Sequence, residues 1–175
     1  MQWFLLWLAQ GFGVGRIPFA PGTFGSMVGV LWVMVLLLTQ NLWAYIAGTI
    51  LGFFISVWLC GVGERILKQK DPSSVVMDEI TAMPVCFLAF FAHDWFKDGH
   101  LPAPETPFAS PQWKTLLIVF ILFRVFDITK PSPVRQSQAL HGGWGITVDD
   151  FLAGLYVMAL TLIPIFWPVA QGWRF

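Results

Sequence analysis

The chain has 175 residues, of which 57% are hydrophobic and only 11% are charged, and its mean hydropathy is +0.69. Soluble domains carry roughly 25% charged residues, so this composition favours a bilayer as the solvent and excludes a disordered chain. Ten basic residues balance ten acidic ones, which leaves no net positive field to attract nucleic acid. Cys60 and Cys86 both lie in apolar runs, as small buried side chains do, and not in a metal or disulfide pattern.

The N-terminal part of the chain predicts an interfacial helix followed by a membrane hairpin. Trp3–Leu8 is apolar but lacks the basic region and cleavage site of a signal peptide, so we expect it to lie at the membrane surface. The polar residues Thr39–Asn41 separate two apolar runs, Phe24–Leu38 and Leu42–Val62. Because a membrane span needs about 20 residues, these runs predict two helices that turn at Thr39–Asn41. Two buried helices of a soluble core are the alternative.

Three further apolar runs complete an all-α fold, an integral membrane bundle with about four to five membrane-embedded helices. Ile80–Phe91 is short and contains Pro84, which predicts a kink or the first turns of a helix. Trp113–Phe126 ends in charged residues, and Phe151–Trp167 is stopped by prolines. We expect residues 1–175 to form a single membrane-embedded domain. Within it, residues 1–23 would form an interfacial and phosphate-binding segment, and residues 93–112 an irregular outward loop rich in Pro and Gly.

Charge asymmetry predicts which side of the membrane faces the cytoplasm. With five crossings, most Lys and Arg residues fall on the side that receives residues 64–79 and 127–150, and the positive-inside rule places this side in the cytoplasm. Five acids fall at helix ends on the same side: Asp78, Glu79, Asp127, Asp149 and Asp150. Carboxylates near a bilayer are costly and are usually functional or paired. We therefore expect these acids to form one site.

The segment Gly11–Ser26 offers groups for an anion. It is rich in glycine and contains Pro21-Gly22-Thr23 directly before a predicted helix. Thr23 can cap that helix, Gly22 permits a ligand to approach the backbone, and a helix N-terminus suits a phosphate. An ordinary helix cap is the alternative. The segment is not a Walker P-loop, since no Lys follows the last glycine.

A second motif places two basic residues around one acid. Arg124, Asp127 and Lys130 follow one another at intervals of three residues, so on a helix they share one face. An intrahelical ion pair would explain two of them. Two cationic groups that flank a carboxylate also describe a site that holds a metal and an anionic phosphate together.

Two acidic pairs are candidates for metal binding. Asp78-Glu79 begins an apolar run, where acids can serve the helix dipole or, as oxygen ligands, bind Mg²⁺. Asp149-Asp150 follows the glycine-rich stretch that begins at His141. Adjacent side chains diverge by about 100° on a helix, so we expect one acid to bind the metal and the other to position it or to activate water. The sequence has no Gly-x-Ser-x-Gly elbow and no thiol in a polar setting, which favours attack by metal-activated water on phosphorus.

Taken together, these motifs resemble phosphatidylglycerophosphatase A, a bacterial membrane phosphatase. The resemblance rests on four stretches in the family's order: Gly11–Ser26, Asp78-Glu79, Phe123–Pro133 and His141–Gly154. It implies an all-α, Mg²⁺-dependent phosphomonoesterase that converts phosphatidylglycerophosphate to phosphatidylglycerol and phosphate at the cytoplasmic face of the bacterial inner membrane. Pro84 departs from the resemblance, because an unbroken helix is expected there.

The resemblance also suggests roles for individual residues. Five acids match the family's acidic motifs, and from their chemistry we expect them to be metal ligands and catalytic groups: Asp78, Glu79, Asp127, Asp149 and Asp150. Phosphate contacts are expected from Gly22, Thr23, Ser26, Arg124, Lys130 and His141. The expected partners are the lipid substrate and the bilayer, with no obligate protein partner. A membrane transporter or channel subunit with an acidic cation site is the alternative, but its acids would lie near the middle of the membrane.

Overall fold

The computed structural model describes residues 2–166, and side chains as far as residue 163. The expectations that concern Trp167 and the C-terminal Arg174 lie outside these residues. All regular elements within the described range are helical, which confirms the all-α prediction. The α-helices are α1 (Gln2–Ala9), α2 (Pro21–Leu37), α3 (Leu42–Leu67), α4 (Met77–Asp98), α5 (Trp113–Thr129), α6 (Val134–Ser137) and α7 (Gly143–Phe166), and the short 3₁₀ helices are η1 (Val14–Arg16) and η2 (Thr106–Phe108).

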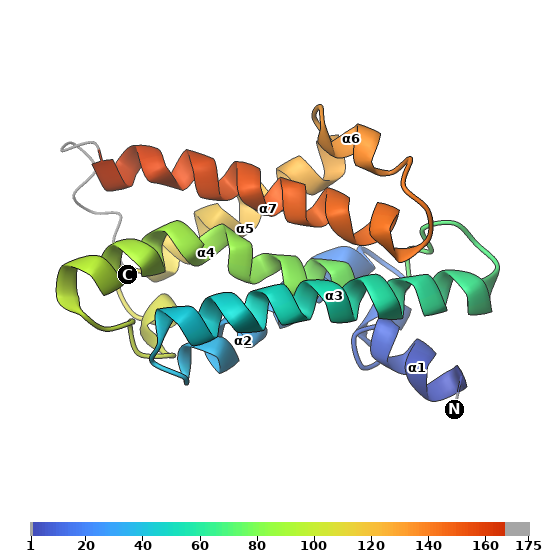
Figure 1. Ribbon diagram of the computed structural model, residues 1–175, viewed down its shortest axis with the longest axis horizontal. Coiled ribbons are helices and arrows are strands. Elements are labelled where there is room, and N and C mark those ends of the chain that lie inside the picture. The colour runs from blue at the N-terminus through green and yellow to red at the C-terminus, as the bar shows by residue number, and fades with distance from the viewer. Residues whose placement is uncertain (1, 167–175) are drawn as a thin grey trace.

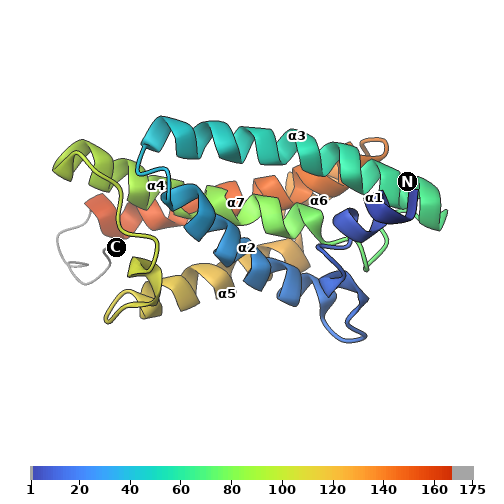
Figure 2. The same cartoon turned by 90° about the horizontal axis from the view of Figure 1, so that it is seen from below.

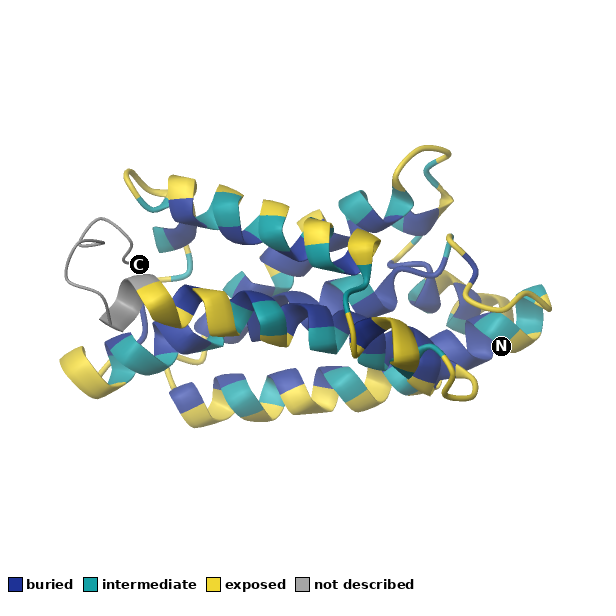
Figure 3. Ribbon diagram, turned by 90° about the horizontal axis from the view of Figure 1, so that it is seen from above, coloured by how far each residue is buried: buried dark blue, intermediate teal, exposed yellow. Residues whose placement is uncertain are grey.

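The long helices form an elongated bundle with α4 at its centre (Figure 1). Helices α2, α3 and α7 all pack against α4, and the α4 side chains Met83, Cys86 and Phe87 are fully buried. A helix that is apolar around its circumference belongs in such a position. Figure 3 shows buried residues along the middle of the bundle and exposed residues along its outward faces. Both cysteines are free and buried, as expected.

The turn between α2 and α3 lies where the sequence predicts it. Helix α2 ends at Leu37 and α3 begins at Leu42. The Oδ1 atom of Asn41 accepts hydrogen bonds from the backbone N–H groups of Trp43 at 2.9 Å and Ala44 at 3.1 Å. These two donors have no partner inside the helix, so Asn41 is the N-cap of α3. The prediction of a helical hairpin is confirmed.

Helix α2 begins earlier than expected, and the prediction that Thr23 caps it was wrong. The N-cap is Ala20, which has a left-handed conformation with φ 45°, and Pro21 occupies the first helical position. Proline suits this position because its φ is already helical and its missing N–H is not needed there. Thr23 lies in the first turn, where its backbone N–H donates to the Ala20 carbonyl.

Helix α7 also begins earlier than the apolar run Phe151–Trp167, because glycines let its first turn lie against α3. A Cβ atom on Gly143 would lie only 1.8 Å from the carbonyl oxygen of Val57. Any larger residue would push the two helices apart at this crossing. Asp149 and Asp150 therefore lie inside α7, nearly two turns after its start, and not at the end of a flexible loop.

Helix α4 continues through Pro84 and so extends beyond the predicted run Ile80–Phe91. The Tyr45 hydroxyl donates a 2.9 Å hydrogen bond to the Pro84 carbonyl oxygen, which ties α4 to α3 at this point. Helix α4 ends at Gly99, whose left-handed φ of 78° is typical of a helix terminus. His93–Asp98, expected in an irregular loop, therefore belong to α4, and Pro84 does not break the helix.

Two of the described helices, α3 and α7, are long and apolar enough to cross a bilayer, while α2 is apolar but shorter. Helix α3 exposes several large apolar side chains, among them Trp43, Leu51, Phe54 and Trp58. Such a surface is unusual in a protein surrounded by water. The structure thus supports membrane association through two of the four to five membrane-embedded helices that the sequence predicts.

Candidate active site

Five segments that are distant in sequence meet around a polar cavity of about 290 Å³. They are the start of α2, the loop between α3 and α4, the start of α4, the end of α5 and the second turn of α7. In Figure 1 this end of the bundle lies opposite the turn between α2 and α3. All five acids singled out in the sequence line the cavity: Asp78, Glu79, Asp127, Asp149 and Asp150.

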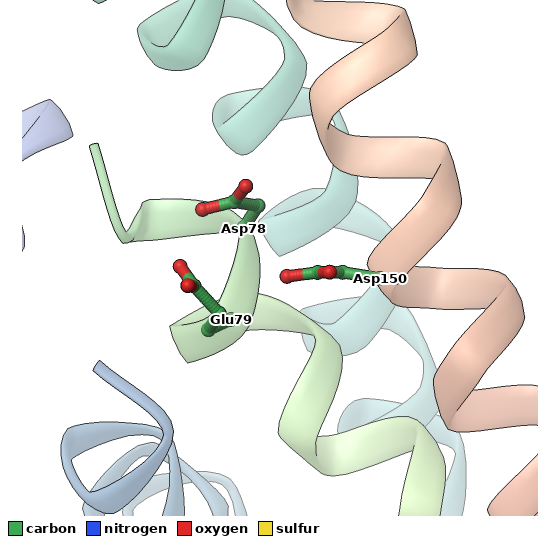
Figure 4. Close-up of side chains that lie close together, drawn as sticks. All are labelled: Asp78, Glu79 and Asp150. Atoms are coloured by element: carbon green, nitrogen blue, oxygen red, sulfur yellow. The ribbon is translucent and has the colours of Figure 1, made fainter. Parts of the chain in front are cut away.

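Three of these acids form a cluster with the geometry of a metal site. Asp78, Glu79 and Asp150 each have a carboxylate oxygen within 4.8 Å of the others. Figure 4 shows that the two acids at the start of α4 and the one from α7 face a common space. Oxygen atoms at such separations can all reach one hard cation, because Mg²⁺ and Ca²⁺ bind oxygen ligands at about 2.0–2.6 Å.

Each of the three clustered acids has one buried oxygen without a partner among the described residues. Asp78 Oδ1, Glu79 Oε2 and Asp150 Oδ2 are buried and accept no hydrogen bond from any residue that the structure describes. Burial is the main reason why the pKa of Asp78 lies well above its ordinary value and the pKa of Glu79 rises to about 7. Buried carboxylates are costly unless a cation compensates them. A divalent cation fits this donor set and would remove that cost.

Asp127 is paired with a basic residue instead. Its Oδ2 atom lies 2.6 Å from Nη1 of Arg124, which precedes it by one turn on α5. The same Nη1 atom donates a 3.3 Å hydrogen bond to Ser26 Oγ on α2. Arg124 Nε is buried and has no partner among the described residues. Arg124 is thus fixed through Nη1 between α5 and α2, and its side chain lines the cavity.

Asp149 is likewise paired with a basic residue. Its Oδ2 atom accepts a 2.5 Å hydrogen bond from Lys130 Nζ and a 3.0 Å hydrogen bond from the Gln138 side chain. Burial alone would lower the pKa of Lys130, but the hydrogen bond to Asp149 and the nearby carboxylates raise it well above its ordinary value. The ammonium group therefore stays protonated at the edge of the cavity.

The start of α2 comes very close to these groups at Gly22. A Cβ atom on Gly22 would lie 2.3 Å from Glu79 Oε1 and 3.2 Å from both Nη atoms of Arg124. Gly22 thus lets the backbone of α2 approach an acid of the cluster and the guanidinium group at the same time. The sequence suggests that Gly22 lets a ligand approach the backbone, and the structure places Gly22 at the cavity, next to Glu79 and Arg124.

Not every residue expected to contact phosphate lies at the cavity. Thr23 does not line it, and His141 is exposed and does not line it either. Ser26 is fully buried and accepts a hydrogen bond from Arg124. Sequence reasoning also missed Asp71 and Ser73, which line the cavity from the loop between α3 and α4. The signal available for these two was their position shortly before Asp78-Glu79, in a turn that contains Pro72.

Residues 7–165 match the family model described as Phosphatidylglycerophosphatase A. The chain belongs to the phosphatidylglycerophosphatase A family. It is 32% identical over 161 residues to Phosphatidylglycerophosphatase A of Haemophilus influenzae, which covers 91% of this chain and 88% of that protein. It is also 32% identical over 165 residues to the protein of the same name from Escherichia coli, which covers 93% and 84% of the two chains.

A third relative carries a different name. The protein of Bacteroides thetaiotaomicron named "Putative phosphatidylinositol-3-phosphatase" is 34% identical over 161 residues, which covers 89% of this chain and 90% of the relative. No solved structure matches the chain significantly. All three relatives carry the names of phosphatases.

Family membership confirms the resemblance drawn from the four motifs and makes the chain an enzyme, a lipid phosphatase of the hydrolase class. It does not favour the alternative of a transporter or channel subunit. The cavity agrees with a phosphatase, because it brings together a cluster of acids able to bind a metal and two basic side chains able to bind a phosphate.

Proposed function

We propose that the chain hydrolyses the phosphomonoester of phosphatidylglycerophosphate to phosphatidylglycerol and inorganic phosphate, and that it requires Mg²⁺. The observation that carries this proposal is that acidic and basic side chains line one cavity. Three carboxylates with buried, unpartnered oxygens line the same cavity as the cationic groups of Arg124 and Lys130. This combination suits a cation and a phosphate that bind side by side.

Asp78, Glu79 and Asp150 would hold the Mg²⁺ ion. The donor set consists of oxygen atoms only, as Mg²⁺ prefers, and the unpartnered oxygens belong to these three residues. When bound, Mg²⁺ would polarise a phosphoryl oxygen and lower the pKa of a water molecule. The sequence suggested all five acids as ligands. Because Asp127 and Asp149 form ion pairs with basic residues, we propose only the other three acids as metal ligands.

Arg124 and Lys130 would bind and orient the phosphate. A guanidinium group presents a planar set of donors that matches phosphate oxygens, whereas an ammonium group acts as a mobile point charge. Asp127 and Asp149 hold these two groups in place through their ion pairs. Gly22 lines the same cavity as these two groups, so a bound phosphate would lie close to the backbone at the start of α2. The substrate's phosphorus would thus be held next to the three-acid cluster, where water attacks it.

The names of the relatives support the choice of substrate. Two of them are named for phosphatidylglycerophosphate and one for a phosphatidylinositol 3-phosphate. Both lipids carry a phosphomonoester on a polar headgroup that is linked to diacylglycerol. This phosphomonoester suits the cavity in either lipid. We choose phosphatidylglycerophosphate because two of the three relatives are named for it.

The direct test is phosphate release by the purified protein in detergent micelles that contain either lipid. We expect turnover of phosphatidylglycerophosphate with Mg²⁺, no turnover with EDTA, and slower turnover of phosphatidylinositol 3-phosphate. Asp150→Asn should abolish activity, while Asp98→Asn, which changes an exposed acid at the far end of α4, should leave it unchanged. Full activity in chelator would contradict the metal mechanism, and faster release from the inositol lipid would reassign the substrate.

The proposed location is the bacterial inner membrane, with five crossings and the cavity on the cytoplasmic side. Arg65, Lys68 and Lys70 lie near the cavity end of the bundle, which agrees with the positive-inside rule. Single cysteines at the exposed positions Gln136 and Asp98, in a background without Cys60 and Cys86, should react with a membrane-impermeant reagent from opposite sides. In intact cells we expect labelling at position 98 only. Labelling of both positions would contradict this topology.

A further inference from the structure

A second cavity, entirely apolar, lies between α2 and α5. Its volume is about 700 Å³, and every residue that lines it is apolar. Phe24, Met27 and Leu31 contribute from α2, and Leu116, Leu117 and Phe120 from α5. Figure 2 shows both helices on the same side of the bundle. Helix α2 packs mainly on α4, whereas α5 packs mainly on α7, and this difference leaves the groove between them.

The groove lies along the same two helices that meet at the polar cavity. Gly22, the second residue of α2, lines that cavity, and Phe24 further along α2 lines the groove. Helix α5 runs the other way and ends near that cavity, so that Arg124 follows the groove residue Phe120 by one helical turn. Both helices thus carry cavity residues at one end and groove residues further along.

The groove also extends for a defined distance away from the polar cavity. Phe24 and Leu31 are separated by seven residues on α2, which corresponds to about 10 Å along the helix axis. Trp113, the first residue of α5, lines the groove at its far end together with Phe108 of η2. The groove is thus apolar along its length and has the polar cavity near one end. This arrangement suits an occupant that is apolar along its length and carries an anionic group at that end.

We propose that this groove binds an acyl chain of the phospholipid substrate while the headgroup phosphate lies in the polar cavity. This inference rests on the proposed function, because only a lipid substrate joins a phosphomonoester to a hydrocarbon chain. Burial of a methylene group contributes about 0.8 kcal/mol, or about a fourfold change in binding. A groove that holds part of one chain would therefore select lipids over the free headgroup and would align the phosphate with Arg124.

The test compares two substrates and two pairs of variants. The substrates are dioleoyl phosphatidylglycerophosphate in micelles and the deacylated headgroup, glycerophosphoglycerophosphate, in the same micelles. Leu31→Trp and Leu117→Trp fill the groove from its two walls. Val35→Trp and Ile121→Trp are matched controls, because these residues are on the same helices and similarly exposed but do not line the groove.

We expect each groove variant to lower kcat/KM for the dioleoyl lipid at least about 10-fold, since exclusion of only two methylenes would suffice. Hydrolysis of the deacylated headgroup should remain at the wild-type rate, which also shows that the variants are folded. The control variants should retain both activities. Equal loss with both substrates, equal loss in groove and control variants, or no loss at all would overturn the groove proposal.

The same experiment separates the two proposals. Wild-type turnover of both substrates with unchanged groove variants would leave the proposed function intact and reject the groove as an acyl-chain site. Failure of the wild-type protein to release phosphate from either substrate would overturn the proposed function, and the groove proposal would fall with it.

Discussion

The acids of the cavity fall into two groups that differ in their partners. Asp127 and Asp149 each form a short ion pair, with Arg124 and Lys130 respectively. Asp78, Glu79 and Asp150 each have a buried oxygen without a partner among the described residues. Under the proposed function the same residue type serves two purposes in one cavity. The paired acids would position the groups that bind the phosphate, and the unpaired acids would bind the cation.

The paired and unpaired acids should also differ in how they affect the stability of the protein. Like charges buried together without a counter-ion destabilise a fold, so an unpaired acid costs stability in the metal-free protein. A paired acid contributes stability, because its removal leaves a basic group without its partner. The two groups should therefore respond in opposite ways to the same change from Asp to Asn.

The largest loss of activity is expected from the unpaired group. Asp78→Asn and Asp150→Asn each remove a proposed metal ligand, and we expect phosphate release to fall by more than about 100-fold, beyond the roughly 10- to 100-fold typical of residues that only support a ligand. In chelator, the Tm of Asp150→Asn should be no lower than that of the wild type, because a buried repulsion has been removed. A folded Asp150→Asn variant with near wild-type turnover would contradict the proposal that Asp150 is a metal ligand.

Replacement of Arg124 tests the anion side of the cavity. Arg124→Lys keeps the charge but loses the planar set of donors, of which Nη1 is engaged by Asp127 and Ser26 and Nε is free. We expect a loss of roughly 10- to 100-fold in kcat/KM, since a bidentate site does not accept this exchange. Mg²⁺ binding should be unaffected. Loss of Mg²⁺ binding would instead show that Arg124 supports the metal site.

The paired acid Asp149 should show a smaller effect on activity and an opposite effect on stability. Asp149→Asn weakens the hold on Lys130 Nζ, and we expect about a 10-fold loss of turnover. We also expect a loss of about 1 kcal/mol in unfolding free energy, or roughly 2–4 °C in Tm. A thermal melt in chelator, run beside Asp150→Asn, provides the comparison. Equal shifts of Tm in the same direction for both variants would contradict the account.

Ser26 should matter least. It is fully buried, donates to the Gly22 carbonyl oxygen at 2.9 Å and accepts from Arg124. Ser26→Ala removes only this support of the guanidinium group, so we expect a loss of a few-fold in kcat/KM with kcat nearly unchanged. A loss as large as that of Arg124→Lys would show that Ser26 contacts the substrate itself.

Sequence patterns were sufficient for the parts of the fold that depend on local chemistry. The charge-free stretch interrupted by Thr39–Asn41 predicted the hairpin of α2 and α3, and Asn41 caps α3 because its side chain needs only its immediate neighbours. Helix starts that depend on distant contacts were missed. Helix α7 begins at Gly143 because this glycine fits against Val57 of α3, and no local signal in the sequence shows that crossing.

The sequence was sufficient to predict which acids line the cavity, but not which of them form ion pairs with basic residues. The positions of the acids at helix ends indicated that Asp78, Glu79, Asp127, Asp149 and Asp150 would meet. The spacing of Arg124 and Asp127 indicated their pair, because both lie on one helix. Lys130 follows the end of α5 in a left-handed conformation, and its pair with Asp149 joins this position to α7. The sequence could not show this pair. For the same reason, Ser26 and His141 were expected to contact phosphate, although one lies behind Arg124 and the other is exposed.

Direct measurement of metal binding tests the division between paired and unpaired acids most sharply. Mn²⁺ can replace Mg²⁺ at oxygen-only sites, and its binding to the purified protein can be followed by electron paramagnetic resonance without any substrate. We predict that wild-type protein and Asp149→Asn bind Mn²⁺ with similar affinity, and that Asp150→Asn loses this binding. Retention of Mn²⁺ by Asp150→Asn, or equal loss in both variants, would contradict this prediction.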